Sequence, residues 1–234
     1  MDTKKLWIIL DDYVKNECKE VDDSHGYEHM KTVALTSLSI VTEKHPGETE
    51  LAYLTIIVAW LHDIADHKYD KTGILKEKLK KYLLELDKKN AKFIMDIIER
   101  VSFSKEDKIL KSGKKLDWQE VLGEKGILIR DIVSDADKLE ALGKIGVERC
   151  IGFTKERYRE EEGKEIEEEE LIKRVHKHAK EKLIRLKDEF IITKRGKILA
   201  EPLHNEMIEE LKTRFNIDFS SWSSSFYNEI NELK

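Results

Sequence analysis

Apolar residues recur at helical spacing along most of the chain, and this pattern predicts a series of amphipathic helices. A clear example has apolar residues at positions 93, 94, 97, 98 and 101, which lie on one helical face. Helices are predicted at about 6–18, 27–44, 48–66, 75–86, 91–103, 118–142, 167–190 and 196–215. Residues 143–153 are predicted to continue the helix at 118–142 after a break.

The segments between these helices carry turn-forming or strongly charged residues. His45-Pro46-Gly47 is a strong helix breaker, and Asp22–Gly26 has the composition of a turn. Ser104–Leu116 is polar and contains Ser112-Gly113, so a connection without regular structure is predicted there. The acidic run at 157–170 is interpreted as a solvated helix face or a mobile loop, with a lid over a site as the alternative.

The helix predicted at about 48–66 is apolar on nearly all sides, which predicts a central position in the fold. Its most apolar stretch, Leu51–Leu61, is too short to span a bilayer and is predicted to be a buried helix. We therefore expect no membrane association.

Composition supports the helical prediction. Of the 234 residues, 40% are hydrophobic, which is enough for a sizeable core, and 39% are charged, as expected of long helices with solvated faces. Only 2 prolines and 11 glycines interrupt the chain. This scarcity favours an all-α fold over a β-sandwich or barrel, and one compact helical domain is predicted over residues 1–234.

The charge pattern narrows the class of partner. The formal net charge is −5, and lysine and glutamate are interspersed along the chain, so a nucleic-acid partner is not expected. A small anionic substrate held by a few local cations is compatible with this pattern. The two cysteines, Cys18 and Cys150, fit neither a metal motif nor a disulfide framework, and no N-terminal signal is visible. A cytoplasmic location is predicted.

The first candidate for chemistry is His62-Asp63, at the end of the apolar helix, where ionisable groups are costly. Asp66 follows one turn later, on the same narrow arc of the helix. Two neighbouring buried carboxylates repel each other unless a cation lies between them, and a divalent metal supplies that cation. Histidine plus carboxylate suits Mn, Fe, Co, Ni or Zn. The alternative is a chance dipeptide that caps a helix end.

The second candidate is Asp135. It stands in a series of otherwise apolar positions spaced by three and four residues, namely 128, 132, 135, 139 and 142. A carboxylate on an apolar stripe needs a partner, and binding a metal ion is one way to supply it. A salt bridge to Arg130 or Lys138 is the alternative.

The third candidate is His29, at the start of the helix predicted at 27–44. Considered alone, it is interpreted as a helix-capping or surface histidine. The order of His29, then His62-Asp63, then Asp135 changes that interpretation, because it places nitrogen and oxygen ligands on three successive buried helices.

This H…HD…D pattern resembles the HD-domain metal-dependent phosphohydrolases, and in particular their small single-domain bacterial branch. The resemblance extends over about residues 23–215, leaving 216–234 as a C-terminal tail. The matching motifs are His25-x3-His29-x3-Val33, Leu61-His62-Asp63-Ile64-Ala65-Asp66-His67-Lys68, Val101-Ser102-Phe103-Ser104 and the segment DADKLEALGKIGVER at 135–149. Gly26, Thr32 and Lys138 depart from the residues usual in the branch, and the metal motif is intact.

The resemblance implies a single helical bundle of the HD type that hydrolyses a phosphate ester or anhydride. His29, His62, Asp63 and Asp135 would hold a divalent metal ion, with manganese as the first choice and Mg, Co, Ni, Fe or Zn as alternatives. The expected partner is a small phosphorylated molecule, with a nucleotide as the first choice. The oligomeric state is not predicted.

Further residues receive roles on this basis. Asp66 is a candidate general acid/base, or alternatively a carboxylate that orients a ligand imidazole. Lys68, Lys138 and Arg149 are candidates for binding substrate phosphates, and each is alternatively a surface cation. His25 is a candidate for assisting a phosphate or a leaving group.

Two competing functions stay open. One is a phosphatase for a non-nucleotide phosphoester, such as a sugar or cofactor phosphate. The other is a catalytically silent HD module that senses nucleotides or acts as a scaffold. An incomplete ligand set would favour the silent module, and the predicted set is complete.

Overall fold

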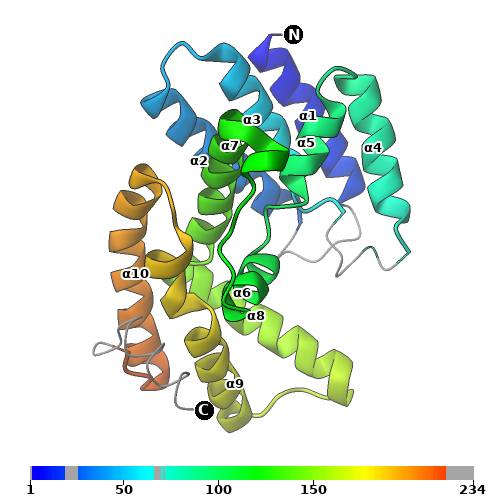
Figure 1. The fold of residues 1–234 in the computed structure, drawn as a ribbon. Coiled ribbons are helices and arrows are strands. Elements are labelled where there is room, and N and C mark those ends of the chain that lie inside the picture. Colours follow the sequence, from blue (N-terminus) through cyan, green and yellow to red (C-terminus); the bar gives the residue numbers. More distant parts are fainter. Residues whose placement is uncertain (1, 19–25, 66–69, 71, 220–234) are drawn as a thin grey trace. The chain divides into compact units, whose positions relative to one another are not determined.

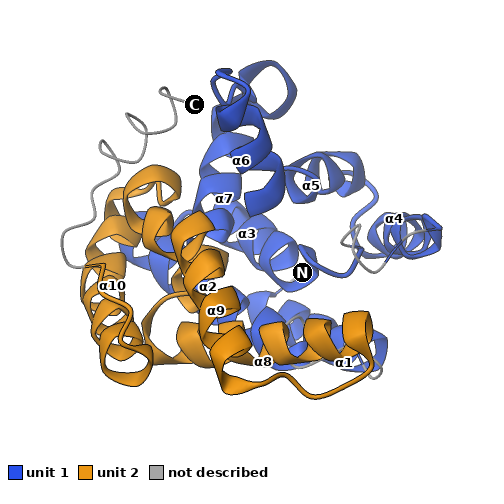
Figure 2. Ribbon diagram, turned by 90° about the horizontal axis from the view of Figure 1, so that it is seen from below, with its two compact units in different colours: residues 1–136 blue, residues 137–234 orange. Residues whose placement is uncertain are grey.

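The computed structural model describes residues 2–18, 26–65, 70 and 72–219, and this part of the chain is helical with no β strand (Figure 1). The predicted all-α fold is confirmed. The chain divides into two compact units, residues 1–136 and 137–234 (Figure 2). Within the described residues, no helix combines the length and the apolar character that crossing a bilayer requires.

The described residues of the first unit form six helices and most of a seventh. These are α1 (Thr3–Glu17), α2 (Tyr27–Lys44), α3 (Thr49–Leu61), α4 (Ile74–Leu86), α5 (Ala91–Ile98), α6 (Phe103–Lys111) and α7 (Gln119–Glu140). The last residues of α7, from Asp137 onward, belong to the second unit. A kink at Gly123, whose φ of 60° favours glycine, interrupts α7 near its start.

The core of the first unit is formed around α3. Eight consecutive residues, from Leu54 to Leu61, are buried, so the helix is enclosed on all sides as predicted. Helix α3 contacts α1, α2 and α5. Trp60 near its end packs edge-on against Trp7 of α1, with ring centroids 5.1 Å apart. This contact with α1 helps to fix the end of α3, which also packs against α2.

The structure corrects the prediction for residues 91–116. Helix α5 ends at Ile98, and a new helix, α6, occupies much of the segment predicted to be an irregular connection. Glu106 of α6 is fully buried and pairs with the buried guanidinium of Arg130 on α7. The Glu106 carboxylate also accepts a hydrogen bond from Ser134 Oγ, at 3.1 Å. This tertiary anchor stabilises a helix whose own sequence is largely polar.

The second unit contains α8 (Gly143–Glu162), α9 (Glu168–Glu181) and α10 (Lys194–Phe215), and α8 packs on both of the others. The helix predicted at 167–190 ends earlier, and a 3₁₀ turn (Leu183–Arg185) and a π-helical turn (Leu186–Phe190) follow it. Most of the acidic run is exposed at the end of α8 and the start of α9, in accord with a solvated face.

Candidate metal centre

Three of the predicted metal ligands converge in the first unit. His29 lies in the first turn of α2, and His62 and Asp63 directly follow α3. Both histidines are buried, and the Asp63 side chain is 13% exposed. One potential ligand atom from each residue lies within 4.8 Å of the other two. The sequence therefore identified a real three-residue cluster.

The Asp63 carboxylate faces both imidazole rings. Its Oδ2 lies 3.5 Å from His29 Nε2, and its Oδ1 lies 3.8 Å from His62 Nε2. Ligand atoms that share one ion at about 2.0–2.2 Å lie roughly 2.8–3.6 Å apart. The first separation falls within that range and the second slightly exceeds it. Both separations are longer than an ordinary hydrogen bond, and the first is compatible with two ligands of one ion.

A backbone contact orients the His62 ring. Its Nδ1 lies 2.8 Å from the carbonyl oxygen of Ala59, one turn earlier on α3. Because a carbonyl oxygen can only accept, Nδ1 must carry the hydrogen, and the lone pair of the neutral ring is then on Nε2. Nε2 is the atom that faces Asp63. This arrangement prepares His62 as a metal ligand.

The donor set suits a divalent transition metal. Two imidazole nitrogens and one carboxylate oxygen match the preferences of Mn, Fe, Co, Ni and Zn. The negative charge of Asp63 near a buried face also favours a cation there. These three residues could therefore hold the predicted ion.

Asp135 occupies a fully buried position on α7, as its place on the apolar stripe predicted. It is not part of the three-residue cluster. Arg130, one of its two proposed salt-bridge partners, pairs instead with Glu106 and Asp131. The role of Asp135 as the fourth ligand stays a prediction.

The other predicted site residues are not brought into the cluster by the described structure. Asp66, Lys68 and His25 lie outside the described residues. Lys138 is buried, and Arg149 forms an ion pair with Glu140 at 2.7 Å. Both belong to the second unit, and their contact with substrate stays a prediction.

A pocket beside the cluster was missed by the sequence reasoning. It has a volume of about 250 Å³, and His62 forms part of its wall. We call it the His62 pocket. Its other walls come from two parts of the sequence. Ala65, Asp70, Gly73 and Lys76 lie between the end of α3 and the first turn of α4, and Met95, Ile98, Glu99, Val101, Ser102 and Lys105 lie between the middle of α5 and the first turn of α6. Two of the matching motifs contribute to it: the motif at 61–68 supplies His62 and Ala65, and the motif at 101–104 supplies Val101 and Ser102.

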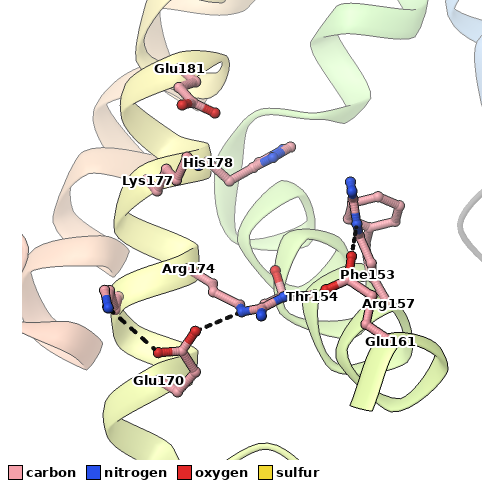
Figure 3. A pocket seen from close by; sticks show the side chains of 10 residues that line it. Phe153, Thr154, Arg157, Glu161, Glu170, Arg174, Lys177, His178 and Glu181 are labelled. Atoms are coloured by element: carbon pink, nitrogen blue, oxygen red, sulfur yellow. Dashed lines mark hydrogen bonds and ion pairs between the residues drawn. The ribbon is translucent and has the colours of Figure 1, made fainter. Parts of the chain in front are cut away.

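A larger pocket, of about 440 Å³, lies between α8 and α9 in the second unit (Figure 3). We call it the α8–α9 pocket. The Arg174 guanidinium bonds Glu161 and Glu170, each at 2.8 Å, and Glu161 also accepts from Arg157. These bonds raise the pKa of Arg174 and lower the pKa of both carboxyl groups. The charges of this network neutralise one another.

The two cysteines do not provide a nucleophile. Both are free and buried, and desolvation raises the pKa of each thiol to about 11. At neutral pH both are therefore protonated, whereas nucleophilic catalysis requires the thiolate.

No family model matches the chain. The curated protein YpgQ of Bacillus subtilis, described as uncharacterized, is 27% identical over 202 residues, which cover 84% of this chain and 86% of YpgQ. The crystal structure of YpgQ in complex with ADP has a TM-score of 0.63 at 20% identity, covering 90% of this chain and 93% of the other. A crystal structure of an HD-superfamily hydrolase from Bacillus thuringiensis has a TM-score of 0.60 at 22% identity, with 91% and 96% covered. The chain therefore has the helical fold of these proteins, an HD-superfamily hydrolase among them.

Proposed function

We propose that this protein is a metal-dependent phosphohydrolase of the HD type that acts on a small phosphorylated molecule, with a nucleotide as the preferred substrate class. The observation that carries the proposal is the convergence of His29, His62 and Asp63. The lone pair of the neutral His62 ring is on Nε2, the atom that faces Asp63. Similarity in fold to an HD-superfamily hydrolase supports it.

His29 Nε2, His62 Nε2 and an oxygen of Asp63 would hold the ion, with Asp135 as the fourth ligand. A divalent ion bound there supplies a water of lowered pKa and offsets charge on the phosphoryl oxygens. The contact between His62 and Ala59 keeps the ring in the ligand orientation throughout the reaction. Manganese is our first choice of metal, because the nitrogen and oxygen donors accept it.

Asp66 would take the proton from the attacking water or deliver one to the leaving oxygen. It follows Asp63 by three residues, which places it close to the ligands in the sequence. Lys68, Lys138, Arg149 and His25 are the proposed contacts for substrate phosphates or the leaving group. The alternative role for Asp66 is to orient a ligand imidazole.

The preference for a nucleotide is supported by the complex of YpgQ with ADP. A phosphatase for a sugar or cofactor phosphate is the second candidate, because the same metal centre serves any phosphoester. A silent sensor is disfavoured by the three converging ligands, since a module that only binds nucleotides has no need of them.

The test is a phosphate-release screen of purified protein against nucleotides and non-nucleotide phosphoesters, each with Mn, Mg, Co or Ni. We expect turnover of at least one nucleotide, complete dependence on the metal, and loss of activity with EDTA. Turnover of sugar or cofactor phosphates alone would favour the second candidate. Nucleotide binding without turnover under any metal would favour the sensor.

A further inference from the structure

The His62 pocket has an apolar floor and a charged rim. Met95, Ile98 and Val101 form the floor, and each is between 5% and 8% exposed. Among the described residues that line it, Lys76 and Lys105 are the two cations, and Asp70 and Glu99 are the two carboxylates.

Three of these four charges are already compensated. The Asp70 carboxylate accepts hydrogen bonds from the backbone N–H groups of Leu75 and Lys76, at 3.1 and 2.8 Å, and so caps the start of α4. The Lys76 ammonium pairs with Glu99 Oε1 at 2.5 Å.

The charge of Lys105 is not compensated in this way. Its Nζ donates to the backbone carbonyl of Glu99 at 2.8 Å, and no carboxylate of the described residues lies within ion-pair distance of it. Lys105 is therefore the lysine of the pocket that forms no ion pair with a carboxylate of the described residues.

The position of Lys105 on α6 is also unfavourable for a cation. The N-cap residue is Ser102, so Lys105 stands in the first turn of a nine-residue helix. The helix dipole is positive at this end and disfavours lysine there, whereas it favours a bound anion. Ser102 does not use its hydroxyl to cap the helix, and it also lines the pocket. An anion in the pocket would be attracted by the ammonium group of Lys105 and by the positive end of the α6 dipole.

We propose that the His62 pocket binds a phosphate group of the substrate, with Lys105 as a phosphate-binding residue and the Ser102 hydroxyl as a second donor. His62 lines the pocket, and its buried imidazole belongs to the metal centre, so the pocket adjoins that centre and a phosphate held there lies beside the metal ligands. This inference rests on the proposed phosphohydrolase function and adds Lys105, which lies outside the matching motifs, as a substrate contact.

Three variants test it. Lys105→Gln removes the charge and keeps most of the side-chain length, and Lys105→Arg keeps the charge. Lys108→Gln is the matched control, because Lys108 and Lys105 both line a groove beside Trp118, whereas Lys108 does not line the His62 pocket. Binding is measured on the manganese-loaded full chain with α,β-methylene ADP, which resists hydrolysis, and with adenosine, which has no phosphate.

We expect Lys105→Gln to bind the ADP analogue about 10- to 100-fold more weakly, the scale of one lost hydrogen bond to a charged group. Lys105→Arg should recover most of that affinity, and Lys108→Gln should resemble the wild type. Adenosine binding and the Tm of Lys105→Gln should not fall, because the lysine opposes the helix dipole. With a hydrolysable nucleotide, KM should rise more than kcat falls.

Affinity of Lys105→Gln for the ADP analogue within threefold of wild type would overturn the assignment. So would an equal loss in Lys108→Gln, or no phosphate-dependent binding by the wild-type protein. Failure of the proposed function looks different. If Lys105 governs binding of the ADP analogue but no phosphorylated compound is hydrolysed, the pocket assignment stands and the hydrolase proposal falls.

Discussion

The His62 pocket and the α8–α9 pocket both contain cations and carboxylates, and the α8–α9 pocket is the larger of the two. In the α8–α9 pocket the guanidinium of Arg174 donates hydrogen bonds to Glu161 and Glu170, and these carboxylates neutralise its charge. In the His62 pocket the ammonium of Lys105 meets only a carbonyl oxygen among the described residues. Lys177 of the α8–α9 pocket likewise forms no ion pair with a carboxylate of the described residues. The chemistry of the neighbouring residues, with the metal-ligand cluster beside the His62 pocket, therefore distinguishes the two pockets better than size does.

The largest expected effect is the loss of catalysis on removing an imidazole from the metal centre. His62→Ala deletes a ligand and should reduce activity to the uncatalysed background, because water at the site is no longer activated. His178→Ala deletes an imidazole that lines the α8–α9 pocket and should leave kcat/KM within about twofold of wild type. Initial rates of phosphate release measure both. Equal losses in the two variants would mean that the pockets are not functionally distinct.

Asp66→Asn is expected to have the next largest effect. The amide keeps the size of the carboxylate but cannot take up a proton, so kcat should fall by on the order of 10²–10⁴ if Asp66 is the general acid/base. Metal content and substrate affinity should stay near those of the wild type. A kcat within a few-fold of wild type would remove Asp66 from proton transfer, and loss of metal would assign it to the support of the ligands.

A smaller contrast concerns stability. The ion pair of Glu106 with Arg130 is buried, whereas Glu161 of the α8–α9 pocket pairs at the surface. Glu106→Ala leaves a buried guanidinium with only part of its compensation and should lower the free energy of unfolding by about 3 kcal/mol. Glu161→Gln should change the Tm little, because exposed pairs contribute little. Urea and thermal unfolding measure both, and a larger loss in Glu161→Gln would reverse the comparison.

The parts of the fold that could be predicted from the sequence are those stabilised by local patterns. The apolar stretch Leu51–Leu61 predicted the buried helix, whereas the helix ends at Leu61 and not at about residue 66 as predicted. Helix α6 could not be predicted in the same way, because Glu106 and Arg130 are 24 residues apart in the sequence. The polar character of 104–116 therefore indicated a connection where the tertiary ion pair stabilises a helix.

The candidate site shows the same division. Motif spacing predicted His29, His62 and Asp63, which the fold brings together. The His62 pocket has walls from segments with no common motif, so Lys105 became visible only when α3, α4, α5 and α6 were placed in space. Metal ligands within a motif can thus be predicted from the sequence, whereas the lining of a pocket depends on how the helices pack.

The most direct test of the account is the metal content of the purified protein. Elemental analysis after dialysis against manganese should find about one divalent ion per chain in the wild type and in His178→Ala. His29→Ala and Asp63→Ala should each retain almost none, because each loses one of three converging ligands. Asp135→Ala should also lose the ion if Asp135 is the fourth ligand. Equal metal content in wild type, His29→Ala and Asp63→Ala would contradict the assignment of this cluster as the metal centre.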